Sequence, residues 1–189
     1  MSTLFEQYQQ LPIDGSLLAL TPGEITVPYY CYPLDAVPIG FEGPILYCFL
    51  PAYGEMVFAA DPESCADASV YPLANDFADF LRLILACGSA NPIEQIIWMT
   101  LAQFDQHLQA EKARQTPQQT ETLSLLAKHF SLAPMEDPYS YVKALQDDFD
   151  SSRIAYSDDY YDTLGLERPD GTTADASLEG EMALFQPER

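Results

Sequence analysis

Two acidic stretches contain the side chains that are best suited to bind a partner. One reads as the loop after a predicted strand, and the other is rich in tyrosine as well as in acidic residues. The candidate residues are Asp61, Glu63, Asp67, Asp158, Asp159, Tyr160 and Asp162. Carboxylates pair with Lys and Arg, and aromatic faces attract the same cations. We predict that both stretches bind a basic protein, with a solvated turn and a tail packed through its tyrosines as the alternatives.

The cysteines and histidines form no pattern that predicts a metal centre. Neither Cys-x-x-Cys nor paired-histidine spacing occurs among Cys31, Cys48, Cys65, Cys87, His107 and His129. The acidic loop also lacks the Asp-x-Asp-x-Asp-Gly spacing and the distal Glu of a calcium loop. Residues 33–44 contain glycines but no phosphate-binding pattern. We therefore predict no metal, no cofactor and no catalytic residue, and we expect four ordinary packed thiols.

The charge of the chain restricts its possible partners. There are 29 acidic residues against 8 Lys and Arg, which gives a formal net charge of −21. Arg82 is the only Lys or Arg before Lys112. Nucleic acids and anionic lipid surfaces are bound through clustered Lys and Arg, so both are excluded as partners. A basic protein fits the charge, and a role of the charge in solubility alone is the alternative.

The hydropathy pattern predicts no membrane segment. No apolar run approaches the ~20 residues that span a bilayer. The first residues, Met-Ser-Thr-Leu-Phe-Glu, lack the basic region and apolar core of a secretory signal. We expect a cytoplasmic protein.

A helix predicted at residues 75–87 is the element that must organise the fold around these candidates. Asn75 is the predicted N-cap, Asp76 and Asp79 suit the positive end of the helix, and Gly88 is the predicted stop. One apolar stripe runs along it at helical spacing: Phe77, Phe80, Leu81, Ile84 and Leu85. We predict that Phe80 and Leu81 are buried against a sheet or another helix.

A β-hairpin is predicted at residues 45–60, with Gly54 in its turn. Both strands are apolar at nearly every position, and alternate side chains of a strand point to opposite faces. The sheet is therefore expected to be covered on both faces. We also predict an edge strand at 24–32, interrupted by Pro28, and an irregular connection over 33–44.

Helices are predicted for most of the chain from residue 100 to residue 149. A capping box of Thr100 and Gln103 starts the first, with Leu101, Phe104 and Leu108 inward, and two further helices begin at Pro117 and Pro138. Residues 93–98 are read as a buried segment, either a short helix or a strand. Each helix must bury an apolar face, and the sheet or the 75–87 helix provides the surface.

These elements predict an α+β fold, with a mainly antiparallel sheet packed with helices and a C-terminal helical extension. We expect a single domain over residues 1–165, with the extension at about 101–150. Residues 166–189 are expected to be an acidic, mobile tail because they offer little to bury.

Two motifs in the segment from residue 36 to residue 88 form a recognisable pattern. They are Gly54-Glu55-Met56-Val57-Phe58-Ala59-Ala60-Asp61 and, after a loop, Tyr71-Pro72-Leu73-Ala74-Asn75-Asp76-Phe77-Ala78-Asp79-Phe80-Leu81. With these motifs the segment resembles the SUKH superfamily, which includes immunity proteins and regulators of cell-wall synthesis. In that family a Gly-x-Val-Tyr-Phe-like strand leads through a loop to an Ala-x-Ser-Phe-x-x-Phe-Leu helix. Leu11-Pro12 is similar to the family's N-terminal Leu-Pro. The short N-terminal helical part and the helices after residue 100 depart from the pattern.

The resemblance implies a non-enzymatic α+β domain that neutralises a nuclease-type toxin as an immunity protein, or that acts as a regulatory scaffold. It provides no catalytic residues. Two alternatives from other classes stay open. The first is a hydrolase or transferase that combines Cys31, Cys48 or Cys65 with a distant histidine and the acidic loops. The second is a structural or oligomeric protein without a dedicated partner.

Overall fold

The computed structural model describes residues 2–171 and has an α+β fold. One antiparallel sheet has its strands in the order β1-β2-β3-β4, so every pair of neighbouring strands is also consecutive in the chain. The strands are β1 (Val37–Glu42), β2 (Ile45–Phe49), β3 (Val57–Ala60) and β4 (Val70–Ala74). The predicted hairpin is β2 and β3, and Gly54 has a φ of +70° in the connection between them.

Helices precede and follow this sheet. They are α1 (Leu4–Gln9), α2 (Phe77–Cys87), α3 (Asn91–Glu94), α4 (Leu101–Ala113), α5 (Pro117–Phe130), α6 (Pro138–Asp147) and α7 (Asp158–Leu164). Short 3-10 turns occur at Gly15–Leu18, Pro51–Tyr53, Gln95–Ile97 and Ser151–Arg153. Within residues 2–171 no helix is long and apolar enough to cross a membrane.

The prediction that the sheet is covered on both faces is confirmed. Tyr47 of β2 points into a core that it shares with α1, α2 and the later helices. Its neighbours Leu46 and Cys48 point the other way, into a second core. No helix of the 101–147 region covers that second face, which is packed instead by the irregular segment 25–36 and by residues 149–160, which include the start of α7.

Helix α2 is the central packing element, as predicted. Phe80 and Leu81 are completely buried, and so are Leu83 and Ile84, because the sheet lies on one side of α2 and helices lie on others. Gly88 ends the helix with a φ of +95°, as expected for a left-handed cap.

The predicted N-cap of α2 is wrong by one residue. Asp76, not Asn75, caps the helix, and its Oδ1 accepts a hydrogen bond from the backbone N of Asp79. The backbone N of Asn75 instead donates to the hydroxyl of Tyr141, a residue of α6. A tertiary contact therefore decides between two adjacent residues that are equally good caps by type.

Two predictions for the segment 24–44 are also wrong. Residues 24–32 form no strand, because Pro28 interrupts pairing and the chain crosses the second face of the sheet, burying Cys31 and Tyr32. Residues 37–42 are a strand, β1, and a register shift between Pro38 and Gly40 accommodates the proline.

Glycine is required at position 40 of β1. A Cβ atom at Gly40 would lie 2.9 Å from the Cα of Leu20. The backbone of the 15–21 segment crosses β1 at this point, and Thr21 pairs with Phe41 along the outer edge of the strand. Part of the sheet edge is thereby closed.

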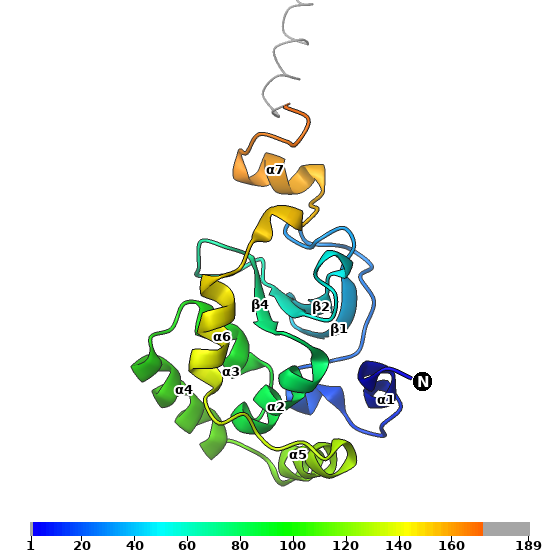
Figure 1. Ribbon diagram of the computed structural model, residues 1–189, viewed down its shortest axis with the longest axis vertical. Coiled ribbons are helices and arrows are strands. Elements are labelled where there is room, and N and C mark those ends of the chain that lie inside the picture. Colours follow the sequence, from blue (N-terminus) through cyan, green and yellow to red (C-terminus); the bar gives the residue numbers. More distant parts are fainter. Residues whose placement is uncertain (1, 172–189) are drawn as a thin grey trace, which may run out of the picture.

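The helices after residue 100 pack on the rest of the chain. Helix α6 lies beside β4, α5 packs on α2, and α4 contacts α3 (Figure 1). Phe104, Leu126 and Val142 from these helices are buried in the same core as Phe80. Helices α4, α5 and α6 begin at the predicted residues: Thr100 and Thr116 cap α4 and α5, and Asp137 caps α6, with Pro117 and Pro138 as the first helical residues of α5 and α6.

Two residues predicted to be inward are exposed. Leu101 is 51% exposed because it is the first residue of α4, before the helix reaches the core. Residues 91–97 form α3 and a 3-10 turn, which bury Ile93 and Ile96 but leave Trp98 42% exposed. Most of the predicted mobile tail, residues 172–189, lies outside the described residues.

Candidate functional site

The first predicted acidic stretch is a tight loop between β3 and β4. The backbone N of Asp61 donates to the carbonyl O of Ser69 at 2.8 Å, which closes the loop. The carboxylate of Asp61 is largely buried and accepts a hydrogen bond from the backbone N of Glu63 at 2.9 Å. Burial raises its pKa. Asp61 therefore stabilises the loop. Of the three predicted residues in this loop, Glu63 and Asp67 face solvent.

The second stretch forms α7, and Arg168, which follows this helix in the chain, compensates part of its negative charge. Arg168 donates to both carboxylate oxygens of Asp162, at 2.6 and 2.7 Å, and lies 3.9 Å from a carboxylate oxygen of Asp158. Asp159 forms no ion pair within the described residues. Asp159 is thus the carboxylate of α7 most available to a partner.

Tyr160 packs the helix α7 onto the body of the protein. Its ring lies parallel to that of Tyr156 with centroids 3.8 Å apart, and it also stacks on Tyr30 at 6.3 Å. This is the arrangement expected for a tail packed through its tyrosines. Tyr160 was predicted to contact a partner, but most of its ring packs against other residues of this protein.

Tyr30 also connects α7 to the acidic loop. Its hydroxyl donates to the carbonyl O of Pro62 at 3.5 Å while its ring stacks on Tyr160. Two acidic stretches far apart in the sequence therefore adjoin one another. We call their exposed carboxylates the acidic surface: Glu63, Asp67, Asp158, Asp159 and Asp162. Helix α7 lies at the end of the molecule away from α4 and α5 (Figure 1).

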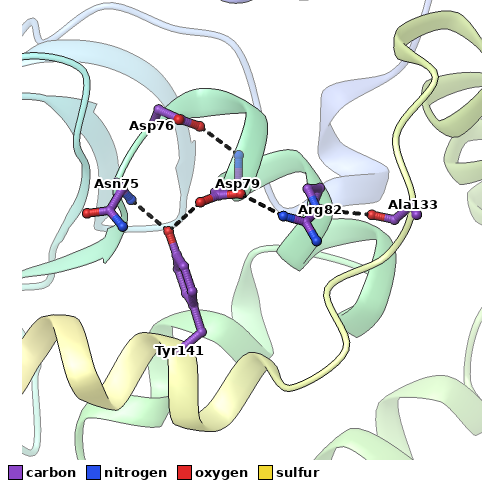
Figure 2. A network of polar contacts seen from close by, with 6 residues as sticks. All are labelled: Asn75, Asp76, Asp79, Arg82, Ala133 and Tyr141. Atoms are coloured by element: carbon purple, nitrogen blue, oxygen red, sulfur yellow. Dashed lines mark hydrogen bonds and ion pairs between the residues drawn. The ribbon is translucent and has the colours of Figure 1, made fainter.

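Arg82, the first basic residue of the chain, forms its contacts within the fold and does not reach the acidic surface. Arg82 pairs with Asp79 at 3.0 Å and donates to the carbonyl O of Ala133 at 3.3 Å. The hydroxyl of Tyr141 donates to the other oxygen of Asp79 at 2.8 Å. As Figure 2 shows, this network fastens α6 and the segment before it to the start of α2.

Two neighbouring acidic residues, Glu94, which is buried, and Glu42, which is partly buried, were not predicted from the sequence. Glu94 of α3 is 3% exposed and accepts a short hydrogen bond from the hydroxyl of Tyr71. Burial raises its pKa to about 7. Glu42, at the end of β1, accepts hydrogen bonds of 3.2 Å from the side-chain N of Asn91, and burial raises its pKa too. The one available signal was the position of Glu94 inside the apolar segment from Ile93 to Ile97.

The candidate cysteines Cys31 and Cys48 do not form a nucleophilic site with a histidine. Burial raises the pKa of the Cys31 and Cys87 thiols to about 12, so both are protonated near neutral pH, whereas a thiolate is the attacking species. Cys31 and Cys48 lie in the second core, and the sheet separates them from the core that contains α4 and α5, the helices of His107 and His129. Cys65 is exposed on the acidic loop.

Removal of divalent metals is expected to leave the stability of the protein unchanged. Within residues 2–171 no group of three or more His, Cys, Asp or Glu side chains is arranged to hold a metal ion. A structural metal adds its binding free energy to folding, so its chelation lowers the melting temperature. We expect identical melting temperatures with and without excess EDTA. A drop of several degrees, or one equivalent of zinc by elemental analysis, would contradict this.

Comparisons of this chain with protein-family models, with curated proteins and with solved structures find no match.

Proposed function

We propose that this protein is a non-enzymatic, cytoplasmic protein-binding module of the SUKH type that binds a basic partner protein through the acidic surface. The negative charge best suits an immunity protein that covers a cationic toxin, such as a nuclease. A regulatory scaffold with a basic client is the second form that the resemblance implies.

The observation that carries this proposal is a set of exposed carboxylates without cations. Within the described residues Glu63, Asp67 and Asp159 form no ion pair. Carboxylates left unpaired repel one another, and a cationic surface that docks on them relieves this repulsion and accelerates association.

Exposed apolar side chains accompany these carboxylates. Leu34 is 67% exposed, and its backbone N donates to the carbonyl O of Ala155, next to Tyr156. Tyr29 is 48% exposed beside Tyr30, and Leu164 at the end of α7 is 45% exposed. Protein interfaces commonly combine aromatic or aliphatic contacts with complementary charge at the rim. This combination favours a protein partner over a role of the charge in solubility alone.

The enzymatic alternative has less support. Cys31 and Cys48 are buried, protonated and separated by the sheet from the helices that carry the histidines. The oligomeric alternative is distinguished by the mass of the purified protein in solution, since a closed oligomer that hides the acidic surface would leave no site for a basic partner.

Neutralising the unpaired carboxylates is expected to slow association with the partner about tenfold at low salt. The variant is Glu63→Gln, Asp67→Asn and Asp159→Asn, which leaves the ion pairs of Arg168 intact. Partners are captured from native lysate at low salt, eluted with salt and identified by mass spectrometry. The association rate of the purified partner is then measured from low ionic strength to beyond 0.15 M, where the Debye length falls to about 8 Å.

The matched control carries the same change in net charge on the helical side of the protein: Asp105→Asn, Glu121→Gln and Glu136→Gln. These exposed residues form no ion pair within residues 2–171. We expect this control to change the association rate less than twofold. Equal effects of both variants, or a partner whose binding ignores salt and both variants, would show that the acidic surface is not the binding site.

A further inference from the structure

A groove with a volume of about 680 Å³ opens between α1, the start of α2 and the β2–β3 connection. Its floor is formed by three aromatic rings: Phe5 of α1, Phe49 of β2 and Phe77 of α2. Phe5 meets Phe49 and Phe77 edge to face, with centroids 5.3 and 5.1 Å apart. The rings hold one another in place, so the groove is built into the core of the fold.

The groove and the acidic loop lie at opposite ends of the sheet. Val37, Phe49, Val57 and Ala74 are paired in register across the four strands at the groove end. The acidic loop leaves the sheet after Ala60 and returns before Val70, which pair with each other at the other end. The groove is therefore a separate site from the acidic surface.

The rim of the groove is negatively charged. Glu6, Glu55 and Asp76 are among the lining residues, and none of the lining residues within the described range 2–171 is Lys, Arg or His. One oxygen of Glu6 accepts a hydrogen bond from the backbone N of Thr3, and one oxygen of Asp76 accepts from that of Asp79. These bonds fix two carboxylates in position and leave each a second oxygen for a ligand. Glu55 is exposed beside Gly54 and forms no ion pair within the described residues.

We propose that this groove binds an arginine side chain that an extended segment of a partner protein presents between apolar neighbours. A guanidinium stacks on aromatic faces and pairs with carboxylates, and its methylene stem suits an apolar floor. An anionic ligand would be repelled, and a purely apolar ligand would desolvate the carboxylates without pairing them.

The shape and surroundings of the groove favour a protein segment over a free small cation. The groove is larger than one side chain requires, and its wall continues along Val37 and Pro38 at the start of the edge strand β1. Val37 is 45% exposed. Aliphatic residues on either side of the arginine can cover this wall, whereas free arginine would leave it in water.

The test uses the full chain labelled with ¹⁵N and three probes. The first probe is acetyl-Leu-Arg-Leu-amide, and the second replaces its arginine with citrulline, a neutral isostere. The third is free L-arginine. We expect the arginine peptide to shift the backbone amide signals of Phe5, Phe77 and Ala78, and the citrulline peptide to bind about tenfold more weakly. Free arginine is expected to bind more weakly than the arginine peptide.

A variant that removes one negative charge tests whether the carboxylates of the rim bind the arginine peptide. Glu55→Gln is expected to weaken binding of the arginine peptide about threefold to fivefold, and Glu136→Gln, an equal charge change on the linker before α6, is expected to leave it unchanged. Both side chains are exposed, so both variants are expected to fold.

Several results would overturn the proposal. Equal binding of the arginine and citrulline peptides would show that the charge is not recognised. Free arginine binding as tightly as the peptide would identify a small-molecule ligand. Signal changes confined to the acidic loop and α7 would place peptide binding on the acidic surface and leave the function proposed there standing.

Discussion

Replacing Phe80 with alanine is expected to lower the free energy of unfolding by about 3–5 kcal/mol. Phe80 is completely buried on α2, between the sheet and the other helices. Its ring lies 6.1 Å from that of Tyr47 and 6.2 Å from that of Phe77. The substitution removes the transfer free energy of the ring and leaves a cavity that such a densely packed core can only partly close. Equilibrium unfolding in urea measures the difference.

The matched control is Phe130→Ala, the same substitution at the end of α5, where the side chain is only half-buried. We expect less than half the loss of stability there, because less area leaves water on folding and the site can relax. A loss below about 1 kcal/mol for Phe80→Ala would mean that α2 is not the centre of the core.

Replacing Glu94 with glutamine is expected to raise the free energy of unfolding by about 1–3 kcal/mol at pH 8. Burial raises the pKa of Glu94 from 4.5 to about 7. Between these two values the folded protein holds a proton that the unfolded chain releases. Stability from this group is therefore present at low pH and is lost as the pH rises through 7. Glutamine is neutral at every pH, and its carbonyl oxygen can still accept the hydrogen bond of Tyr71.

Unfolding measured at pH 4.5, 6 and 8 tests this prediction. The difference in stability between Glu94→Gln and the unmodified protein should be close to zero at pH 4.5 and largest at pH 8. Glu121→Gln, on an exposed position of α5, provides the control for general charge effects and should show a small difference throughout. A difference for Glu94→Gln that does not change with pH would mean that folding does not raise the pKa of Glu94.

The candidate sites were only partly accessible from the sequence. Composition and local spacing identified both acidic stretches, because carboxylates concentrate there without intervening cations. Their proximity depends on Tyr30, which lies in a segment that the sequence misassigned as a strand. The groove could not be predicted, since its lining comes from segments near residues 3–9, 37–38, 49–55 and 76–78.

The elements with local signals could be predicted from the sequence. The apolar stripe and Gly88 define α2, the threonine caps define the starts of α4 and α5, and the apolar strands around Gly54 define the hairpin. In each case the residues that carry the signal are close enough along the chain to act within one turn or one pair of strands.

Contacts between residues far apart in the chain depend on the assembled fold and could not be predicted. Tyr141, 66 residues after Asn75, accepts its backbone hydrogen bond and leaves the capping position to Asp76. Tyr71 meets Glu94 only because α3 packs on the sheet, and residues 25–36 cover the second face together with residues 149–160. These contacts form only when the whole core is assembled. An apolar side chain can pack against many different partners, and a hydrogen-bonding group can pair with many, so the final packing decides which partner each one meets.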